Sequence, residues 1–237
     1  MKNFSLFPLR RMLPGLFFCL GALVSHAQLA DPPPLLTIRV ACVGDSITYG
    51  SGLTNRQADS YPVCLGHLLG AGYDVRNFGV SGATMLHQGN LPYVRQKAHA
   101  AAVAFKPDIV IIMLGTNDSK HDKTGQNPDN WQYKTNFVHD YEALIGEFRR
   151  ADPAVKVYVC DPTPTFPGRW GIDNTIIHDE IIPLVQQVAS DENAGTIDLY
   201  RAFADKKDLF PDTVHPNDAG AALMASTIYT ALTGRTP

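Results

Sequence analysis

The stretch VACVGDSITYG, residues 40–50, changes character near its centre. Its first four residues form an apolar run with two valines, which is typical of a buried strand. The run ends in Gly44, Asp45 and Ser46, three residue types that are common in turns. The stretch therefore predicts either an ordinary turn, with Asp45 tying down its own backbone, or a serine nucleophile presented at the end of a strand.

Apolar, strand-like segments alternate with helical segments over most of the chain. Predicted strands cover residues 36–44, 73–80, 107–115, 155–160 and 194–199, and predicted helices cover residues 60–70, 91–105, 129–150, 174–190 and 216–232. This alternation is typical of βαβ units, so we predict an α/β fold: a three-layer α/β/α flavodoxin-like sandwich with a five-stranded parallel sheet. In such sheets, ligands bind beyond the carboxyl ends of the strands.

The N-terminal region has the composition of a secretory signal. Residues 1–27 combine three basic residues and no acidic residue with an apolar segment that ends in small residues up to Ala27. We predict a signal peptide over 1–27 with cleavage after Ala27, a Pro-rich lead-in over 28–36 and one catalytic domain over 37–237. The protein would then be secreted or periplasmic, and a retained membrane anchor is the alternative.

The net charge and the cysteines limit which binding partners and which disulfide bonds we expect. The chain has 237 residues, of which 45% are hydrophobic, enough for one domain with a core. Cleavage would leave 17 basic and 23 acidic side chains, a formal charge of −6, which argues against nucleic acid or an anionic membrane as partner. Cys42, Cys64 and Cys160 are scattered, so we predict free thiols, with one oxidised pair as the alternative. No motif indicates a metal or cofactor, and the oligomeric state is not indicated.

Polar residues follow several of the predicted strands. Ser46 follows the first strand, Gly82 the second, Asn117 the third, and Asp212 and His215 come one loop after the fifth. The carboxyl ends of parallel strands meet at one edge, so we expect these groups to converge there. A hydroxyl, an imidazole, a carboxylate and amide donors are the groups that acyl transfer through serine requires.

Each of these residues has a predicted role. Ser46 would be the nucleophile, His215 the base that takes its proton, and Asp212 the partner of the other ring nitrogen. The oxyanion hole would comprise the backbone N–H groups of Ser46 and Gly82 and the side-chain amide of Asn117. For Asn117 a simple capping role in its loop is the alternative.

Four sequence blocks resemble one known family when they are taken in order. They are GDSIT with Ser46, NFGVSGAT with Gly82, GTND with Asn117, and DTVHPN with Asp212 and His215. Together they are similar to the SGNH hydrolases, also called the GDSL esterase/lipase family, and span most of the predicted catalytic domain. The resemblance implies the sheet architecture, a Ser-His-Asp triad and a three-donor oxyanion hole.

A second segment has the same spacing as the predicted Asp-His pair. Asp118 and His121 are also separated by two residues and follow the third strand. We favour Asp212 and His215, because the resemblance places the pair just before the last helix with a proline after the histidine. His121 would then be a loop residue that could contact substrate. Trp131 and Trp170 could each offer a platform for a sugar ring, with packing as the alternative.

The substrate prediction rests on the composition of the loops. Segments 121–131 and 164–174 are polar with few aromatic residues, which suits a carbohydrate better than a fatty chain. Within the family the chain most resembles secreted carbohydrate O-acetylesterases of the acetylxylan or sialate type. We therefore predict a secreted serine esterase that removes small acyl groups, in the first place acetyl, from carbohydrates through an acyl-Ser46 intermediate; its partner would be a small-molecule or glycan ester. The alternatives are a lipolytic esterase or lysophospholipase-like thioesterase, and a non-catalytic flavodoxin-like binding module.

Overall fold

The computed structural model describes Met1 and residues 37–237. The predicted signal peptide and Pro-rich lead-in therefore lie, apart from Met1, outside the described residues. The domain boundaries and the export of the protein stay predictions. Among the described residues, no helix has both the length and the apolar character needed to cross a membrane.

Five parallel strands form the sheet, in the order β2-β1-β3-β4-β5. They are β1 (Ile38–Gly44), β2 (Tyr73–Gly79), β3 (Ile109–Met113), β4 (Lys156–Asp161) and β5 (Gly195–Asp198). The predicted five-stranded parallel sheet is thus confirmed. Gly44 pairs with Gly79 on one side and with Met113 on the other, so the carboxyl ends of the three strands are aligned.

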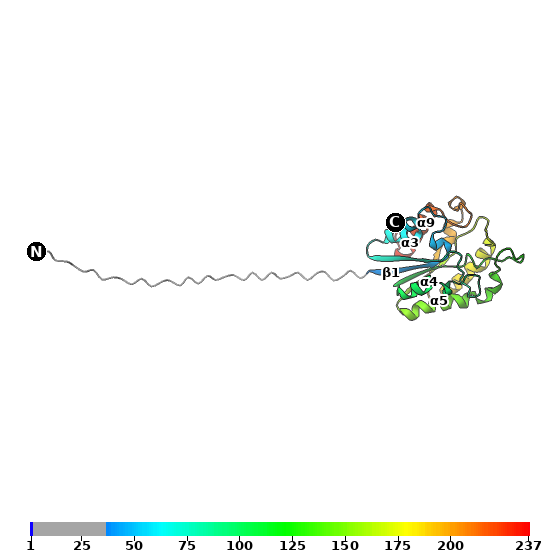
Figure 1. Ribbon diagram of the computed structural model, residues 1–237, viewed down its shortest axis with the longest axis horizontal. Coiled ribbons are helices and arrows are strands. Elements are labelled where there is room, and N and C mark those ends of the chain that lie inside the picture. Colours follow the sequence, from blue (N-terminus) through cyan, green and yellow to red (C-terminus); the bar gives the residue numbers. More distant parts are fainter. Residues whose placement is uncertain (2–36) are drawn as a thin grey trace. The chain divides into compact units, whose positions relative to one another are not determined.

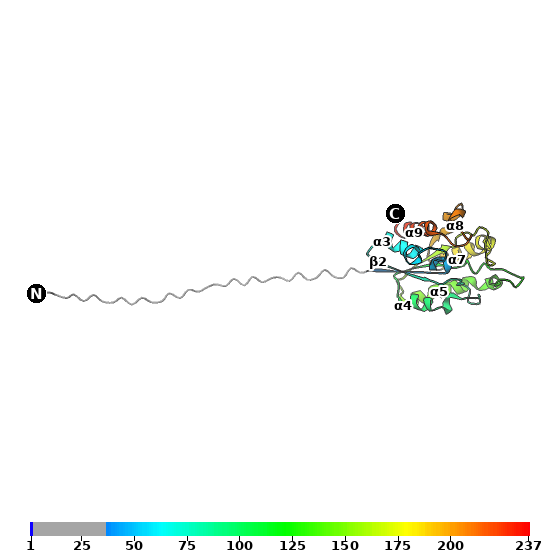
Figure 2. The same ribbon diagram turned by 45° about the horizontal axis from the view of Figure 1, so that its top comes forward.

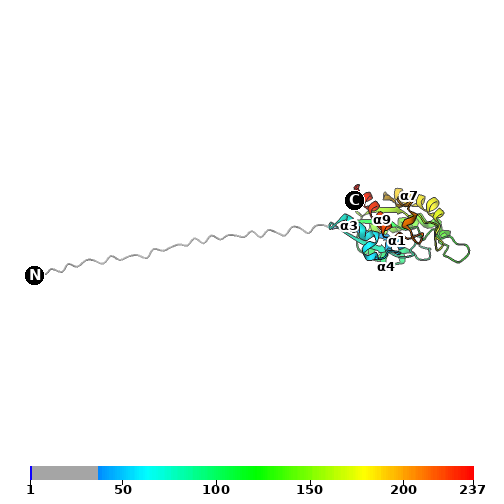
Figure 3. The same cartoon turned by 90° about the horizontal axis from the view of Figure 1, so that it is seen from above.

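Helices cover both faces of this sheet, because side chains on both faces of its strands are apolar. Along β1, Val40 and Cys42 contribute to one buried cluster, and Ala41 and Val43 contribute to the other. Helices α3 (Tyr61–Leu69) and α9 (Asp218–Thr233) pack together on one face (Figure 1). Helices α4 (Lys97–Ala104), α5 (Phe137–Ala151) and α7 (Ile182–Asp191) contribute to the cluster on the other face. Figure 2 shows α4 and α5 on the opposite side of the sheet from α3 and α9. Figure 3 looks onto the face that α3 and α9 cover.

Shorter elements complete the domain and modify the predicted helices. They are α1 (Ser46–Tyr49), α2 (Arg56–Asp59), η1 (Tyr93–Arg95), η2 (Trp131–Asn136), α6 (Asn174–Ile176), η3 (Ile177–Ile181), α8 (Leu199–Phe203) and η4 (Lys207–Leu209). The helix predicted over 91–105 is interrupted at Gln96, and the one predicted over 129–150 begins with the 3₁₀ turns of η2. Within 174–190, η3 is a π turn just before Pro183, which has no N–H to continue a regular ladder.

The start of the last helix is set by a side-chain cap. The sequence predicts that this helix begins at Pro216, but α9 begins at Asp218. The Oδ1 atom of Asn217 accepts a hydrogen bond from the backbone N–H of Gly220 and caps the first turn. Two residues that precede the helix are therefore left to shape the loop that carries His215.

The three described cysteines are unbonded thiols. Cys42 and Cys160 are buried in the core and Cys64 is half-buried. Burial raises the pKa of the Cys42 thiol to about 12, with a hydrogen bond to Tyr61 opposing the rise. The two core thiols therefore act as small apolar side chains.

Candidate active site

Ser46 is held at the end of β1 as the first residue of α1. The carboxylate of Asp45 caps this short helix, since its Oδ1 atom accepts a hydrogen bond of 2.9 Å from the backbone N–H of Ile47. Gly44 lets the helix fold tightly over the strand, because a Cβ atom there would lie 2.1 Å from the hydroxyl oxygen of Thr48. The Gly-Asp-Ser sequence is therefore a turn that also presents a serine.

The structure brings Ser46, His215 and Asp212 into one hydrogen-bonded chain. The Nε2 atom of His215 lies 2.9 Å from the Oγ atom of Ser46, across a sequence separation of 169 residues. Its Nδ1 atom lies 2.7 Å from the Oδ2 atom of Asp212. An ionised carboxylate can only accept, so Nδ1 carries the proton and Nε2 is left to accept the serine O–H. This is the arrangement that a general base needs.

The loop around Asp212 fixes this arrangement through its backbone. The second carboxylate oxygen, Oδ1, accepts hydrogen bonds from the N–H groups of Val214 (3.0 Å) and His215 (2.7 Å). Thr213 has a φ of +73°, an unusual value for a β-branched residue, and this conformation brings the two N–H groups to one oxygen. Burial raises the pKa of Asp212, but the hydrogen bonds from His215 and Val214 outweigh it and hold the pKa below its ordinary value.

Gly82 and Asn117 line the same cavity as Ser46. The Nδ2 atom of Asn117 donates a hydrogen bond of 3.1 Å to the carbonyl oxygen of Ala83, which fixes the amide. The same Nδ2 atom makes a longer contact of 3.5 Å with the Oδ2 atom of Asp45. Gly82 has a φ of +83°, which side chains other than glycine rarely adopt.

A second buried carboxylate, Asp118, lies in the loop after β3. It accepts hydrogen bonds from the backbone N–H groups of Met85 (2.9 Å) and Leu86 (2.7 Å), and it is fully buried. Burial raises its pKa to about 7, and burial likewise raises the pKa of Asp45 to about 6. Asp118 thus ties two loops together and does not contact His121.

The three predicted substrate-contacting residues have different surroundings. His121 pairs through Nδ1 with the Oδ1 atom of Asp129 at 2.7 Å and is absent from the cavity wall. Trp131 is only 3% exposed and donates its indole N–H to Glu180 at 2.9 Å, so the idea that it offers a platform to substrate is wrong. Trp170 is 46% exposed, and its ring centroid lies 5.5 Å from that of His215.

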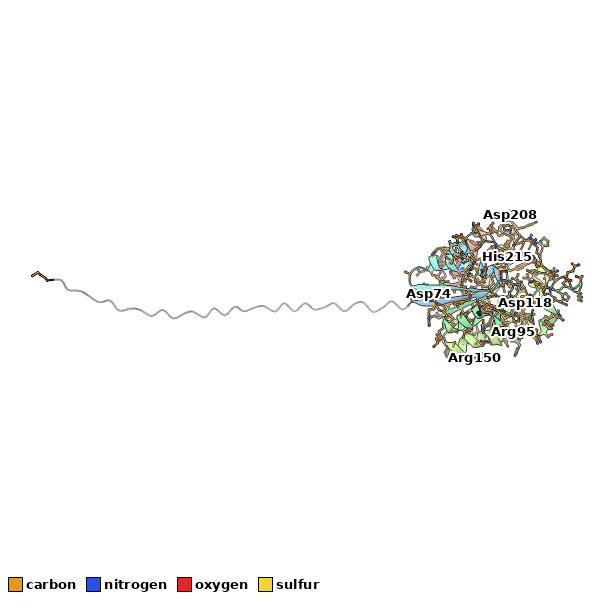
Figure 4. The ribbon with its side chains drawn as sticks, viewed as in Figure 1. Asp74, Arg95, Asp118, Arg150, Asp208 and His215 are labelled. Carbon is orange, nitrogen blue, oxygen red and sulfur yellow. The ribbon has the colours of Figure 1, made fainter. Side chains whose placement is uncertain are left out.

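The hydroxyl of Ser46 opens onto a cavity of about 170 Å³. Its wall consists of Ser46, Ser81, Gly82, Asn117, Lys120, Trp170, Ile172 and His215. Asp74 lies near the start of β2, and His215 is well separated from it in Figure 4. This separation is expected for a site beyond the carboxyl ends of the strands. Sequence reasoning missed Ser81, Lys120 and Ile172. The available signal for Lys120 was its place three residues after Asn117 in the same loop.

The sequence and the fold both match known proteins. The family described as GDSL-like lipase/acylhydrolase matches residues 42–223. An acetylxylan esterase of Xylanibacter ruminicola is 42% identical over 213 residues, which cover 82% of this chain and 43% of that protein. The chain thus spans less than half the length of this curated relative.

Solved structures share the fold at lower sequence identity. The acetyl xylan esterase AlAXEase matches with a TM-score of 0.65 at 21% identity, covering 82% of this chain and 100% of that one. A lipase/acylhydrolase from Enterococcus faecalis matches with a TM-score of 0.67 at 24% identity, covering 85% of this chain and 98% of that one. A carbohydrate acetylesterase from Sinorhizobium meliloti matches with a TM-score of 0.62 at 21% identity, covering 84% and 99%. These matches concern the fold alone.

Proposed function

Because the chain belongs to the GDSL-like lipase/acylhydrolase family, we propose that it is a serine ester hydrolase that removes acetyl groups from carbohydrates. The observation that carries this proposal is the hydrogen-bonded chain from the hydroxyl of Ser46 through His215 to Asp212. It adjoins a small cavity that also contains Gly82 and Asn117.

The first half of the proposed reaction transfers the acyl group to the enzyme. The Oγ atom of Ser46 attacks the ester carbonyl carbon while Nε2 of His215 takes its proton. The carbonyl oxygen becomes an oxyanion that accepts hydrogen bonds from the N–H groups of Ser46 and Gly82 and from the amide of Asn117. Each such donor stabilises the transition state by about 3 kcal/mol. When the intermediate collapses, the C–O bond to the alcohol breaks and the alcohol takes the proton from His215.

The second half releases the acid. A water molecule attacks the carbonyl carbon of acyl-Ser46, and its proton goes to Nε2 of His215. The same donors stabilise the second oxyanion, and His215 returns the proton to Ser46 as acetate leaves. The carboxylate of Asp212 stays ionised throughout, in keeping with its lowered pKa, and stabilises the imidazolium that forms twice in each cycle.

The size of the cavity supports a short acyl group. Binding cavities for drug-sized ligands usually have about 300–1,000 Å³, whereas this one has about 170 Å³. This small size favours acetyl esters over the long chains that a lipolytic esterase takes.

Two further features support a carbohydrate as the alcohol. The relative from Xylanibacter ruminicola is an acetylxylan esterase, and its match covers 82% of this chain. The exposed ring of Trp170 lies at the cavity, where it offers a face for a sugar. The proposal includes export by the signal peptide over 1–27, and an ester substrate without nucleic acid or membrane as partner. The N-terminal residue of protein recovered from culture fractions tests the export step.

The function is tested by acetate release and by a series of p-nitrophenyl esters. We expect the wild-type protein to release acetate from acetylated xylan and to hydrolyse the two-carbon ester fastest. The Ser46→Ala variant should lose this activity. Maximum activity at eight carbons or more would support the lipolytic alternative, and no turnover of any ester would support a binding module.

A further inference from the structure

One side chain in the wall of the cavity at Ser46 ends in an ammonium group, which carries a positive charge. It belongs to Lys120, which is only 9% exposed and contributes to the cavity wall together with Ser46 and Asn117. None of the eight lining residues is acidic. The cavity wall is therefore cationic, and the carboxylates of Asp45, Asp118 and Asp212 act on its residues from outside the lining.

The backbone of Lys120 is fixed while its ammonium group has no protein partner. Its N–H donates to the carbonyl oxygen of Asn117 at 3.4 Å, and its own carbonyl accepts from Trp131 at 3.0 Å. Among the described residues, none accepts a hydrogen bond from the Nζ atom, and no carboxylate lies within 4.0 Å of it. A nearly buried ammonium with three unused donors is expected to bind either water or an anion.

The two buried carboxylates nearby do not use these donors. Asp118 accepts from the N–H groups of Met85 and Leu86, and Asp45 accepts from the N–H group of Ile47. Their charges act on Lys120 over a longer distance. Burial lowers the pKa of Lys120, and the charges of Asp45 and Asp118 oppose this decrease. They therefore favour the charged ammonium and leave its donors to the cavity.

A second cation lies beside the same cavity. The guanidinium group of Arg169 lies over the ring of Trp170, with its central carbon 4.9 Å from the ring centroid. Arg169 is exposed and has no acidic partner within the described part of the chain. Because Trp170 belongs to the cavity wall, Arg169 and Lys120 both attract a negatively charged ligand to the cavity.

We propose that Lys120 binds a carboxylate of the substrate, so that the preferred ester is an acetyl group on a carboxylate-bearing sugar, such as a uronic acid. This proposal rests on the proposed function and specifies its substrate class. A hydrogen-bonded ammonium–carboxylate pair should favour the acidic sugar over its neutral analogue by about 10- to 100-fold in kcat/KM. Arg169, which is exposed to solvent, should contribute a smaller factor of about 2- to 5-fold.

The test compares two matched substrates within each variant. An O-acetylated methyl glucuronoside is the acidic substrate, and its uncharged methyl ester is the neutral one, with release of acetate as the readout. Because the ratio of the two kcat/KM values is taken within one preparation, differences in the amount of folded protein cancel. Lys120→Met should bring this ratio close to one, and Lys120→Arg should retain most of it. The control Lys123→Met removes an exposed lysine of the following loop and should leave the ratio unchanged.

Arg169→Ala and added salt provide measurements that do not depend on the folding of the Lys120→Met variant. Both should reduce kcat/KM for the acidic substrate more than for the neutral one. A wild-type ratio near one, or a ratio that Lys120→Met leaves unchanged, would overturn the proposal. It would also be overturned if Lys120→Met only improved longer p-nitrophenyl esters, because Lys120 would then limit acyl length. Failure of the proposed function itself would look different, since neither the two sugars nor p-nitrophenyl acetate would be hydrolysed.

Discussion

The chain has two Asp-x-x-His segments with identical spacing, at Asp118–His121 and at Asp212–His215, and they have different surroundings. In the second segment, one carboxylate oxygen of Asp212 accepts backbone N–H groups while the other accepts from the ring of His215. In the first, both oxygens of Asp118 point inward to the backbone of residues 85 and 86, and His121 pairs with Asp129. The spacing permits an Asp-His pair, but the backbone conformation decides whether it forms.

Replacement of the histidine in each segment should give the largest difference in activity between the two segments. His215→Ala removes the group that accepts the proton of Ser46 and should lower kcat/KM for p-nitrophenyl acetate by about 10⁴- to 10⁶-fold. His121→Ala should change it less than about 2-fold, because His121 does not line the cavity and its ring pairs with Asp129. Comparable losses in the two variants would mean that the segments share the chemistry.

The acidic partners of the two histidines provide the next contrast. Asp212→Asn retains the shape of the side chain but removes the charge that stabilises the imidazolium, so kcat should fall by about 10²- to 10⁴-fold. Asp129→Asn should leave kcat within about 2-fold. Steady-state kinetics on p-nitrophenyl acetate measures both. Full activity of the Asp212→Asn variant would exclude a role for this carboxylate.

Asn117 directly precedes the Asp118 segment but, unlike Asp118, is expected to take part in the reaction. Loss of its side-chain donor in Asn117→Ala should reduce kcat by about 10²- to 10³-fold while KM changes little. Asn130→Ala is a useful reference, since Asn130 donates to the carbonyl oxygen of Asn117 at 2.8 Å but is absent from the cavity wall. Its loss should cost less than the loss of Asn117. A rise in KM with unchanged kcat, or an equal effect of the two variants, would contradict the assigned role.

Asp118 should affect stability in a pH-dependent way. Its pKa is raised to about 7 in the folded protein, so the folded state retains a proton that the unfolded chain has already lost. The free energy of unfolding should therefore decrease as the pH rises from about 4 to 7, by about 1.4 kcal/mol per unit at most. Asp118→Asn does not titrate and should lack this contribution. Urea unfolding of both proteins at several pH values measures it, and a difference that stays constant with pH would refute it.

Much of the fold and of the candidate site could be predicted from the sequence. The strands were predictable because their apolar runs end in polar residues, and topology then places those ends at one edge of the sheet. The backbone at Thr213, which directs the two N–H groups to Asp212, carries no local sequence signal. The indole N–H of Trp131 donates to Glu180, a residue 49 positions away that no local pattern connects to it. Lys120 likewise lines the cavity together with Ser46, Trp170 and His215, which are distant from it in the sequence.

Labelling of Ser46 by a fluorophosphonate tests the central claim most directly, because the reagent needs an activated serine but no particular sugar. Intact-protein and peptide mass spectra would give the modified residue and the rate of modification. We predict one label on Ser46 in the wild-type protein and in His121→Ala at equal rates, with a loss of about 10³-fold or more in His215→Ala. Unchanged labelling of Ser46 in His215→Ala, or a label on another residue, would contradict the assignment of His215 as its base.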